Sequence, residues 1–166
     1  MRAITILVFL STLVASGAQG EQSSQSVFQL LEGAWQSNGP AFGQTAHSTM
    51  QWQPTLDGRY FRVNYNIAFG AEDAPTSSFT GVGYYRMDSD AETINGFWAD
   101  NTGDLHPIEA SVSADRILST WGEQGKKLGQ TEYRVLDGGD VEVTDWIWRD
   151  GEFRQFNQNS FKKADK

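Results

Sequence analysis

The chain has 166 residues, a formal net charge of −8 and no cysteine. An acidic balance without a cluster of Lys or Arg argues against binding to nucleic acid and to anionic membrane surfaces. The absence of cysteine from the sequence excludes disulfides, so the folded core must be stable without covalent cross-links.

The first twenty residues have the three parts of a secretory signal peptide. Arg2 is a short positive start, residues 3–15 form an apolar run, and Ala18-Gln19-Gly20 suits cleavage before Glu21. The run is shorter than the roughly twenty apolar residues of a membrane-spanning helix, although an uncleaved N-terminal anchor is the alternative. We expect a signal peptide at residues 1–20, a single domain at residues 21–166, periplasmic or secreted localisation, and no integral membrane segment after cleavage.

Beyond the signal peptide, the sequence predicts one short helix followed only by strands. Ser23–Leu31 can form the helix, with Val27, Leu30 and Leu31 on its apolar side, and Gly33 would end it. Segments rich in β-branched and aromatic residues then alternate with turns in which Gly adjoins Asp or Asn. The expected strands are Ala34–Ser37, Ala46–Gln53, Arg59–Phe69, Ser78–Met87, Thr93–Ala99, Pro107–Val112, Ile117–Trp121, Gln130–Leu136, Val141–Trp148 and Phe153–Phe161.

Short turns between consecutive strands favour an antiparallel meander, and closure would remove its two exposed edges. The predicted fold class is therefore all-β, a closed antiparallel meander barrel of about 8–10 strands with a short N-terminal helix. Some strand faces mix apolar and polar residues, as in Val141–Trp148, where Asp145 shares a face with Val143. In the last strand, one face would carry Phe153, Gln155, Asn157, Asn159 and Phe161. Such mixed faces suit a barrel that holds a partly polar cavity.

An ordered set of short motifs resembles a known family. Leu31-Glu32-Gly33-Ala34-Trp35 is similar to the Gly-x-Trp that opens lipocalin and other calycin barrels. It is followed by Leu56-Asp57-Gly58-Arg59-Tyr60-Phe61, Gly83-Tyr84-Tyr85, Trp98-Ala99-Asp100 and Tyr133-Arg134-Val135. Together these motifs resemble the DUF1579 family of lipocalin-like bacterial proteins, over roughly residues 30–162. The resemblance implies a calycin-type barrel and no established reaction. We interpret Trp35 as architectural, a ring that plugs one end of the barrel.

The segment Trp98–His106 is the densest group of chemically capable side chains. Asp100, Asp104 and His106 could give a carboxylate–imidazole pair for acid–base chemistry. With Asp145 from a later strand, Asp100 and His106 are the candidate catalytic groups. The alternative interpretation is that Asp100, Asn101 and Gly103 are hairpin-turn residues, chosen for their backbone conformations.

A second set of polar or aromatic residues lies in strand interiors and could orient a ligand if it points inward. These candidate ligand-binding residues are Arg62, Asn64, Trp98, Arg134, Gln155 and Asn157. If the polar members point outward, they form an ordinary solvated face.

Cofactor and nucleophile chemistry find little support in the sequence, and we expect no cofactor and no metal. Zinc sites usually draw on three or four ligands. The sequence has only two histidines, His47 and His106, and no cysteine, so its residue pattern argues against a zinc site. Haem-binding calycin relatives carry an axial histidine near the C-terminus, and this chain has none after His106. Gly-x-Ser-x-Gly is absent from the sequence. Gly81-Val82-Gly83 lacks a phosphate-binding pattern and predicts strand glycines beside a bend or a close aromatic neighbour.

The sequence thus favours an exported barrel that binds a small apolar or amphipathic molecule. An alternative is a cofactor-independent isomerase, cyclase or hydrolase on the same barrel. A third alternative is a filled structural barrel without a cavity of ligand size. The sequence leaves the oligomeric state open.

Overall fold

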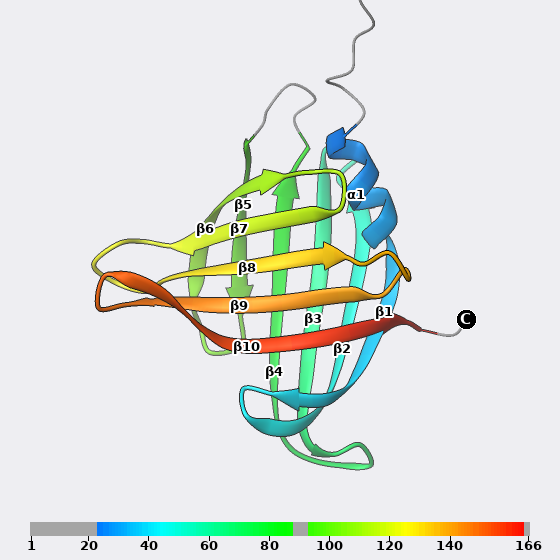
Figure 1. Ribbon diagram of the computed structural model, residues 1–166, viewed down its shortest axis with the longest axis vertical. Coiled ribbons are helices and arrows are strands. Elements are labelled where there is room, and N and C mark those ends of the chain that lie inside the picture. Colours follow the sequence, from blue (N-terminus) through cyan, green and yellow to red (C-terminus); the bar gives the residue numbers. More distant parts are fainter. Residues whose placement is uncertain (1–22, 88–92, 165–166) are drawn as a thin grey trace, which may run out of the picture.

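A computed structural model describes residues 23–87 and 93–164; the predicted signal peptide lies outside the described residues. The elements are α1 (Ser23–Leu31), β1 (Gly33–Ala41), β2 (Gln44–Thr55), β3 (Tyr60–Ala71), β4 (Ala74–Arg86), β5 (Thr93–Asp100), β6 (Leu105–Val112), β7 (Arg116–Gly122), β8 (Leu128–Val135), β9 (Val141–Arg149) and β10 (Glu152–Lys163). Each strand pairs antiparallel with its neighbours in sequence, and β1 pairs with β10 to close the barrel (Figure 1). The predicted closed meander barrel with one short helix is confirmed.

The meander gathers alternate connections at opposite ends of the barrel. Helix α1 and the turns that follow β2, β6 and β8 lie at one end, which we call the helix end (Figure 1). The hairpins β1–β2, β3–β4, β5–β6, β7–β8 and β9–β10 lie at the other end, which we call the open end. The hairpin turns use the chemistry that the sequence predicted: Asp150 and Gly151 both have positive φ, at 55° and 87°.

The helix end is closed by aromatic packing. Val27, Phe28 and Leu31 of α1 are fully buried, and the Phe28 ring lies 5.0 Å from that of Phe61 and 6.1 Å from that of Trp52. The prediction that Leu30 shares the apolar side of the helix is wrong, because its side chain is 48% exposed. At 3.6 residues per turn, Leu30 lies outside the arc that the three buried residues span.

Trp35, on β1, contacts both helix α1 and Lys163 of β10, the strand that closes the barrel. Its Nε1 donates a hydrogen bond to the Leu31 carbonyl oxygen at 2.6 Å, and Lys163 Nζ lies 4.3 Å from the centroid of its ring. Lys163 Nζ also donates to the Glu32 carbonyl oxygen. Gly33 has a φ of 115°, which a residue with a Cβ rarely adopts. The architectural interpretation of Trp35 is therefore confirmed.

Strand alternation is regular in β3 and interrupted in β10. On β3 the side chains from Phe61 to Phe69 alternate into the core as predicted. On β10 a β-bulge at Phe156 shifts the register between Gln155 and Asn157. The predicted regular face of this strand is therefore wrong, because the register shifts at the bulge. Asn157 pairs with Asp145 and Gln155 pairs with Trp146, and the consecutive residues Gln155 and Phe156 both border the interior.

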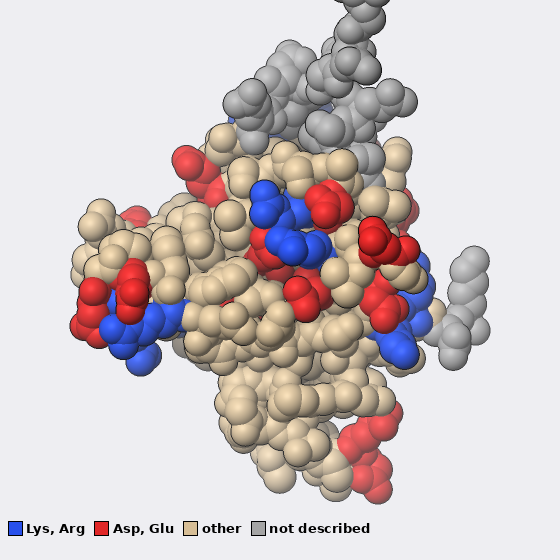
Figure 2. Space-filling model, in the orientation of Figure 1, with Lys and Arg blue, Asp and Glu red and all other residues tan. Residues whose placement is uncertain are grey.

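The described outer surface is mostly uncharged on the face shown in Figure 2, with its charges gathered in a few groups. One group lies over β7 and β8, where Glu132 accepts from Arg116 at 3.4 Å and from Arg134 at 3.0 Å. Another lies over the β9–β10 hairpin, where Arg154 contacts Asp150 and Glu152. In the described part of the chain, no helix has the length and apolar character of a membrane span.

Candidate functional site

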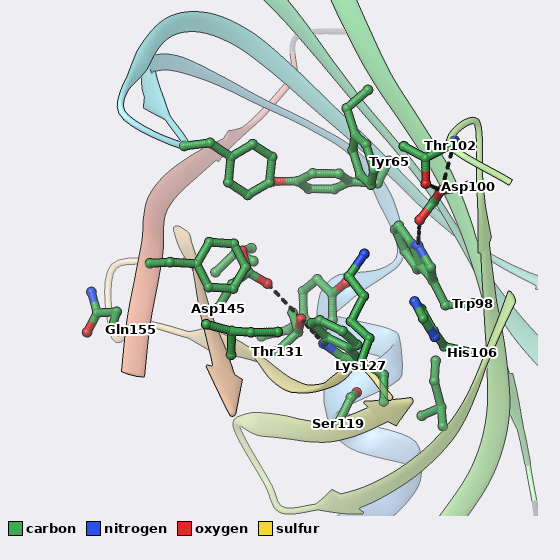
Figure 3. Close-up of a pocket in the computed structure, with 18 of the residues that line it drawn as sticks. Tyr65, Trp98, Asp100, Thr102, His106, Ser119, Lys127, Thr131, Asp145 and Gln155 are labelled. Carbon is green, nitrogen blue, oxygen red and sulfur yellow. Dashed lines mark hydrogen bonds between the residues drawn. The ribbon is translucent and has the colours of Figure 1, made fainter. Parts of the chain in front are cut away.

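The barrel contains a cavity of about 600 Å³ in its open half. Ten strands enclose more space than the side chains at this end fill, and no described residue of helix α1 lines that space (Figure 3). The apolar lining residues are Phe42, Tyr65, Phe79, Tyr85, Trp98, Ile108, Trp121, Tyr133, Val143, Ile147 and Phe156. The polar lining residues are Asp100, Thr102, His106, Ser119, Lys127, Thr131, Asp145, Arg149, Arg154 and Gln155.

A row of five side chains runs along one wall of the cavity, one from each strand from β5 to β9. Trp98 and His106 are cross-strand partners, and the His106 ring lies 5.3 Å from the Trp121 ring. Trp121 Nε1 donates to Thr131 Oγ1 at 3.1 Å, and Thr131 Oγ1 donates to Asp145 Oδ1 at 2.6 Å (Figure 3). This row, which we call the polar belt, joins two of the predicted catalytic residues through a continuous set of contacts.

Asp145 is the half-buried carboxylate at one end of the polar belt. Its Oδ2 accepts a hydrogen bond from Asn157 Nδ2 at 2.8 Å, and the Asn157 Oδ1 accepts from the Phe42 backbone N–H at 3.1 Å. Since a backbone N–H can only donate, the amide of Asn157 is oriented with its NH₂ toward Asp145. Burial raises the pKa of Asp145 above its usual range, and the hydrogen bonds from Asn157 and Thr131 oppose that rise.

Three tyrosine side chains form the inner part of the cavity. Tyr65, Tyr85 and Tyr133 are nearly fully buried and lie close enough to Asp145 for its charge to raise the pKa of each hydroxyl further. Burial is the larger cause, and it raises the pKa of Tyr85 to about 12. The Tyr85 hydroxyl contacts Ser119 Oγ at 3.0 Å. The Tyr65 hydroxyl oxygen is buried, and the neighbouring Asn159 side chain opposes the rise of its pKa.

Two glycines allow the cavity tryptophans to lie flat against the wall. A Cβ at Gly81 would lie 2.0 Å from Trp98 Cζ2, and a Cβ at Gly129 would lie 2.2 Å from Trp121 Cζ2. Each indole ring therefore covers the backbone of a neighbouring strand instead of reaching across the barrel. The predicted close aromatic neighbour of Gly81 and Gly83 is confirmed, since Trp98 contacts both positions. The flat rings leave space in the centre of the barrel.

The predicted turn at the open end proves to be a hydrogen-bonded unit. Asp100 Oδ1 accepts from the backbone N–H and hydroxyl of Thr102, and Asp100 Oδ2 accepts from Trp98 Nε1 (Figure 3). Asn101 bonds to the backbone of β4 through both of its side-chain groups, accepting from the Thr80 N–H and donating to the Ser78 carbonyl. The turn interpretation of this segment is confirmed, although Asp100 also lines the cavity.

An ion pair spans the mouth of the cavity beside His106. Lys127 Nζ, from the β7–β8 loop, lies 2.6 Å from Asp104 Oδ2 in the β5–β6 loop. Both groups are partly exposed, and Lys127 lowers the pKa of Asp104. His106 Nε2 lies 3.6 Å from the same carboxylate oxygen, too far for a normal hydrogen bond. Of the carboxylates that the sequence placed with His106, Asp104 is thus a close neighbour of its ring.

The structure divides the sequence-predicted site residues into two groups. Asp100, His106, Asp145, Trp98 and Gln155 line the cavity, and Asn157 holds Asp145 from behind. Arg62, Asn64 and Arg134 do not line it. On β3, Arg62 and Asn64 alternate with the buried Phe61, Val63 and Tyr65 and so take the outer face, and Arg134 pairs with Glu132.

Several cavity residues were not among the predicted ones, chiefly Tyr65, Tyr85, Thr131, Tyr133 and Lys127. The sequence carried a partial signal for Tyr65, which alternates with apolar residues on β3. Thr131 is recognisable only from the pairing of β8 with β9, which places it opposite Asp145. The role of Thr131 could not be predicted from the residue pattern, because it depends on the strand register.

Comparison with known proteins adds no relative: no protein-family model matches the chain, and no curated protein matches it significantly. The closed ten-stranded meander is compatible with a calycin-like fold. Among the residues that the structure describes, no three potential metal-ligating side chains of His, Asp or Glu come together. The site is thus an aromatic cavity with two hydrogen-bonded carboxylates, Asp100 and Asp145, in its lining.

Proposed function

We propose that this protein binds a small, mostly apolar ligand inside its barrel. The observation that carries the proposal is the cavity of about 600 Å³, a volume within the usual range of small-molecule sites. Its lining is mainly aromatic, with a few convergent polar groups, which is the usual composition of such sites. A filled structural barrel would have no cavity of this size. The family-level resemblance to DUF1579 and other lipocalin-like proteins is part of this proposal.

Tryptophan fluorescence offers a direct test, because two of the six tryptophans, Trp98 and Trp121, line the cavity. We would purify the protein as its cell processes it, extract any bound molecule for mass spectrometry, and titrate it with a panel of lipids and isoprenoids. We expect a saturable change in emission that the Trp121→Phe variant reduces. No bound molecule and no response to the panel would contradict the proposal.

Export by cleavage of residues 1–20 is a second part of the proposal. It is supported by the order of charged, apolar and small residues in that segment. N-terminal sequencing of the protein from fractionated cells should give Glu21 as the first residue in the periplasm or medium. Retention of Met1 in a membrane fraction would instead indicate an anchor.

Asp145 favours a cofactor-independent isomerase, cyclase or hydrolase as a second candidate function. A carboxylate whose pKa burial raises, facing an apolar cavity, is a candidate for accepting or donating a proton. The other candidate groups are His106 in the polar belt and Asp100 at the mouth. Chemical conversion of an extracted ligand by wild type but not by Asp145→Asn would favour the enzyme; recovery of the unchanged ligand would favour the binding protein.

A further inference from the structure

The wall of the cavity holds a carboxylate whose direct hydrogen bonds all come from neutral groups. Asn157 can only present N–H hydrogens to Asp145 Oδ2, because its own oxygen is occupied by the Phe42 backbone N–H. Thr131 receives the Trp121 indole hydrogen and turns its own hydroxyl hydrogen to Asp145 Oδ1. Both oxygens are thus held as acceptors, which is the arrangement of an ionised carboxylate.

No cation among the described residues forms an ion pair with Asp145. Two of the cationic side chains that line the cavity have carboxylate partners of their own: Lys127 pairs with Asp104, and Arg154 pairs with Asp150 and Glu152. A partly buried charge without a counter-ion is unfavourable, and this is why burial raises the pKa of Asp145. A cation that entered the cavity would remove that penalty.

The remaining lining is suited to the same kind of ligand. Because Trp98 and Trp121 lie flat on glycine backbone, they present ring faces to the cavity, and a ring face attracts cations. An ammonium group has three N–H donors, and both the Asp145 carboxylate and the aromatic ring faces can contact it.

We propose that the cavity selects ligands that carry a protonated primary amine on an apolar skeleton, with the nitrogen bound at the Asp145 carboxylate. This inference rests on the proposed ligand-binding function and specifies the chemical class of its ligand. Asp145 supplies the counter-charge, and the indole rings contact the carbon atoms next to the nitrogen.

The other cavity carboxylate, Asp100, is less suited to this role. Its two oxygens already accept three hydrogen bonds, from Trp98 and from the backbone and side chain of Thr102. These bonds stabilise the β5–β6 turn at the mouth of the cavity. The cationic side chains at the mouth of the cavity would attract an anionic ligand rather than an amine, so the experiment includes an anionic probe.

Three probes with one skeleton separate the alternatives: 4-phenylbutylamine, 4-phenylbutan-1-ol and 4-phenylbutyrate, which are cationic, neutral and anionic at pH 7.5. Binding would be measured by calorimetry and by tryptophan emission. We expect the amine to bind at least about tenfold more tightly than the alcohol, as a hydrogen bond to a charged group would give. The butyrate should bind most weakly.

Two variants assign the preference to Asp145. Asp145→Asn keeps an oxygen for the Asn157 amide, so the barrel should fold and bind the alcohol as wild type does, while the tenfold preference for the amine is lost. Asp137→Asn, in an exposed turn at the helix end, makes the same chemical change and should leave the preference intact. Far-ultraviolet circular dichroism checks the fold of both variants.

The outcomes distinguish the two proposals. If the alcohol binds and the amine binds no better, the ligand-binding function stands and the amine inference is wrong. A preference for butyrate, or one removed by Asp100→Asn and not by Asp145→Asn, also overturns the inference. If none of the three probes binds and nothing is extracted from the purified protein, both proposals fail.

Discussion

At the helix end of the barrel, Trp52 is fully buried against the rings of Phe28, Tyr85 and Tyr133, whereas at the open end Trp98 and Trp121 border a cavity of about 600 Å³. Aromatic side chains dominate both regions. The difference lies in what supports the rings: helix α1 inserts Phe28 into one end, while glycines allow the rings of the other end to lie against the wall. The helix therefore fills one half of the barrel, and glycine residues, which have no Cβ atom, leave the other half hollow.

The largest expected effect comes from removing a ring at the helix end. Phe28→Ala should lower the free energy of unfolding by about 3–5 kcal/mol, because the fully buried ring leaves a cavity among well-packed neighbours. Phe79→Ala at the open end should lower it less, since Phe79 is only partly buried and already borders empty space. Chemical denaturation compares the two variants. Equal losses would mean that the two ends are packed alike.

Gly81→Ala should fill part of the hollow end and have the next largest effect. The new methyl group would lie within 3 Å of three Trp98 ring atoms, so the indole must move off the wall and into the cavity. We expect a loss of about 1–3 kcal/mol in stability and weaker binding of any cavity ligand, measured by denaturation and fluorescence titration. Gly39→Ala is the matched control, because nothing lies within 4 Å of its Cβ position. Unchanged binding by Gly81→Ala would refute the role given to this glycine.

The pH dependence of stability tests the contribution of the Asp145 carboxylate, which lies in the open half of the barrel. The pKa of Asp145 in the folded protein is raised above its usual value of 3.8, so folding shifts its equilibrium toward the protonated form relative to the unfolded chain. Its contribution to stability is therefore fully present below the unfolded pKa and is lost as the pH rises through the folded pKa. Asp145→Asn should be more stable than wild type at pH 8, and the difference should shrink as the pH falls. Thermal unfolding at several pH values measures both; a variant less stable than wild type at pH 8 would contradict this sign.

The smallest effect is expected at the mouth. Asp104→Asn breaks the exposed ion pair with Lys127 that joins the β5–β6 and β7–β8 loops. Stability should hardly change, because exposed ion pairs contribute little. Ligand association and dissociation should both become faster, which stopped-flow fluorescence would detect. Slower exchange would show that the ion pair does not restrain the mouth.

The ten strands and the closed barrel could be predicted from the sequence because each turn and each alternating segment is a local pattern. The polar belt could not, because it depends on register. Thr131 meets Asp145 only when β8 and β9 pair as they do, and the bulge at Phe156 decides which side chains of β10 turn inward. Asp145, His106 and Trp98 were found as chemically capable residues, but their common cavity follows from the closure of the sheet.

The face assignment of the other candidates shows where residue pattern alone falls short. Arg62 and Asn64 have strand-interior positions and polar groups, as Asn157 has, yet they lie on the outside of the barrel. Alternation defines the two faces of a strand, but it does not show which face points into the barrel when both faces carry polar groups. For Arg62, the apolar residues on the other face of β3 show that its side chain points outward, and the sequence reveals that alternation. For Asn157, the β-bulge determines the direction of the side chain, and the sequence does not reveal the bulge.

The contact between β1 and β10 has a consequence for the order in which the chain can fold. Two residue pairs, Trp35 with Lys163 and Gln36 with Lys162, close the barrel, and the Ala164 N–H donates to the Ala34 carbonyl. The bond from Lys163 to Glu32 spans 131 residues of sequence. Such distant pairings form slowly and late. During synthesis the barrel therefore cannot close until the residues of β10 have left the ribosome.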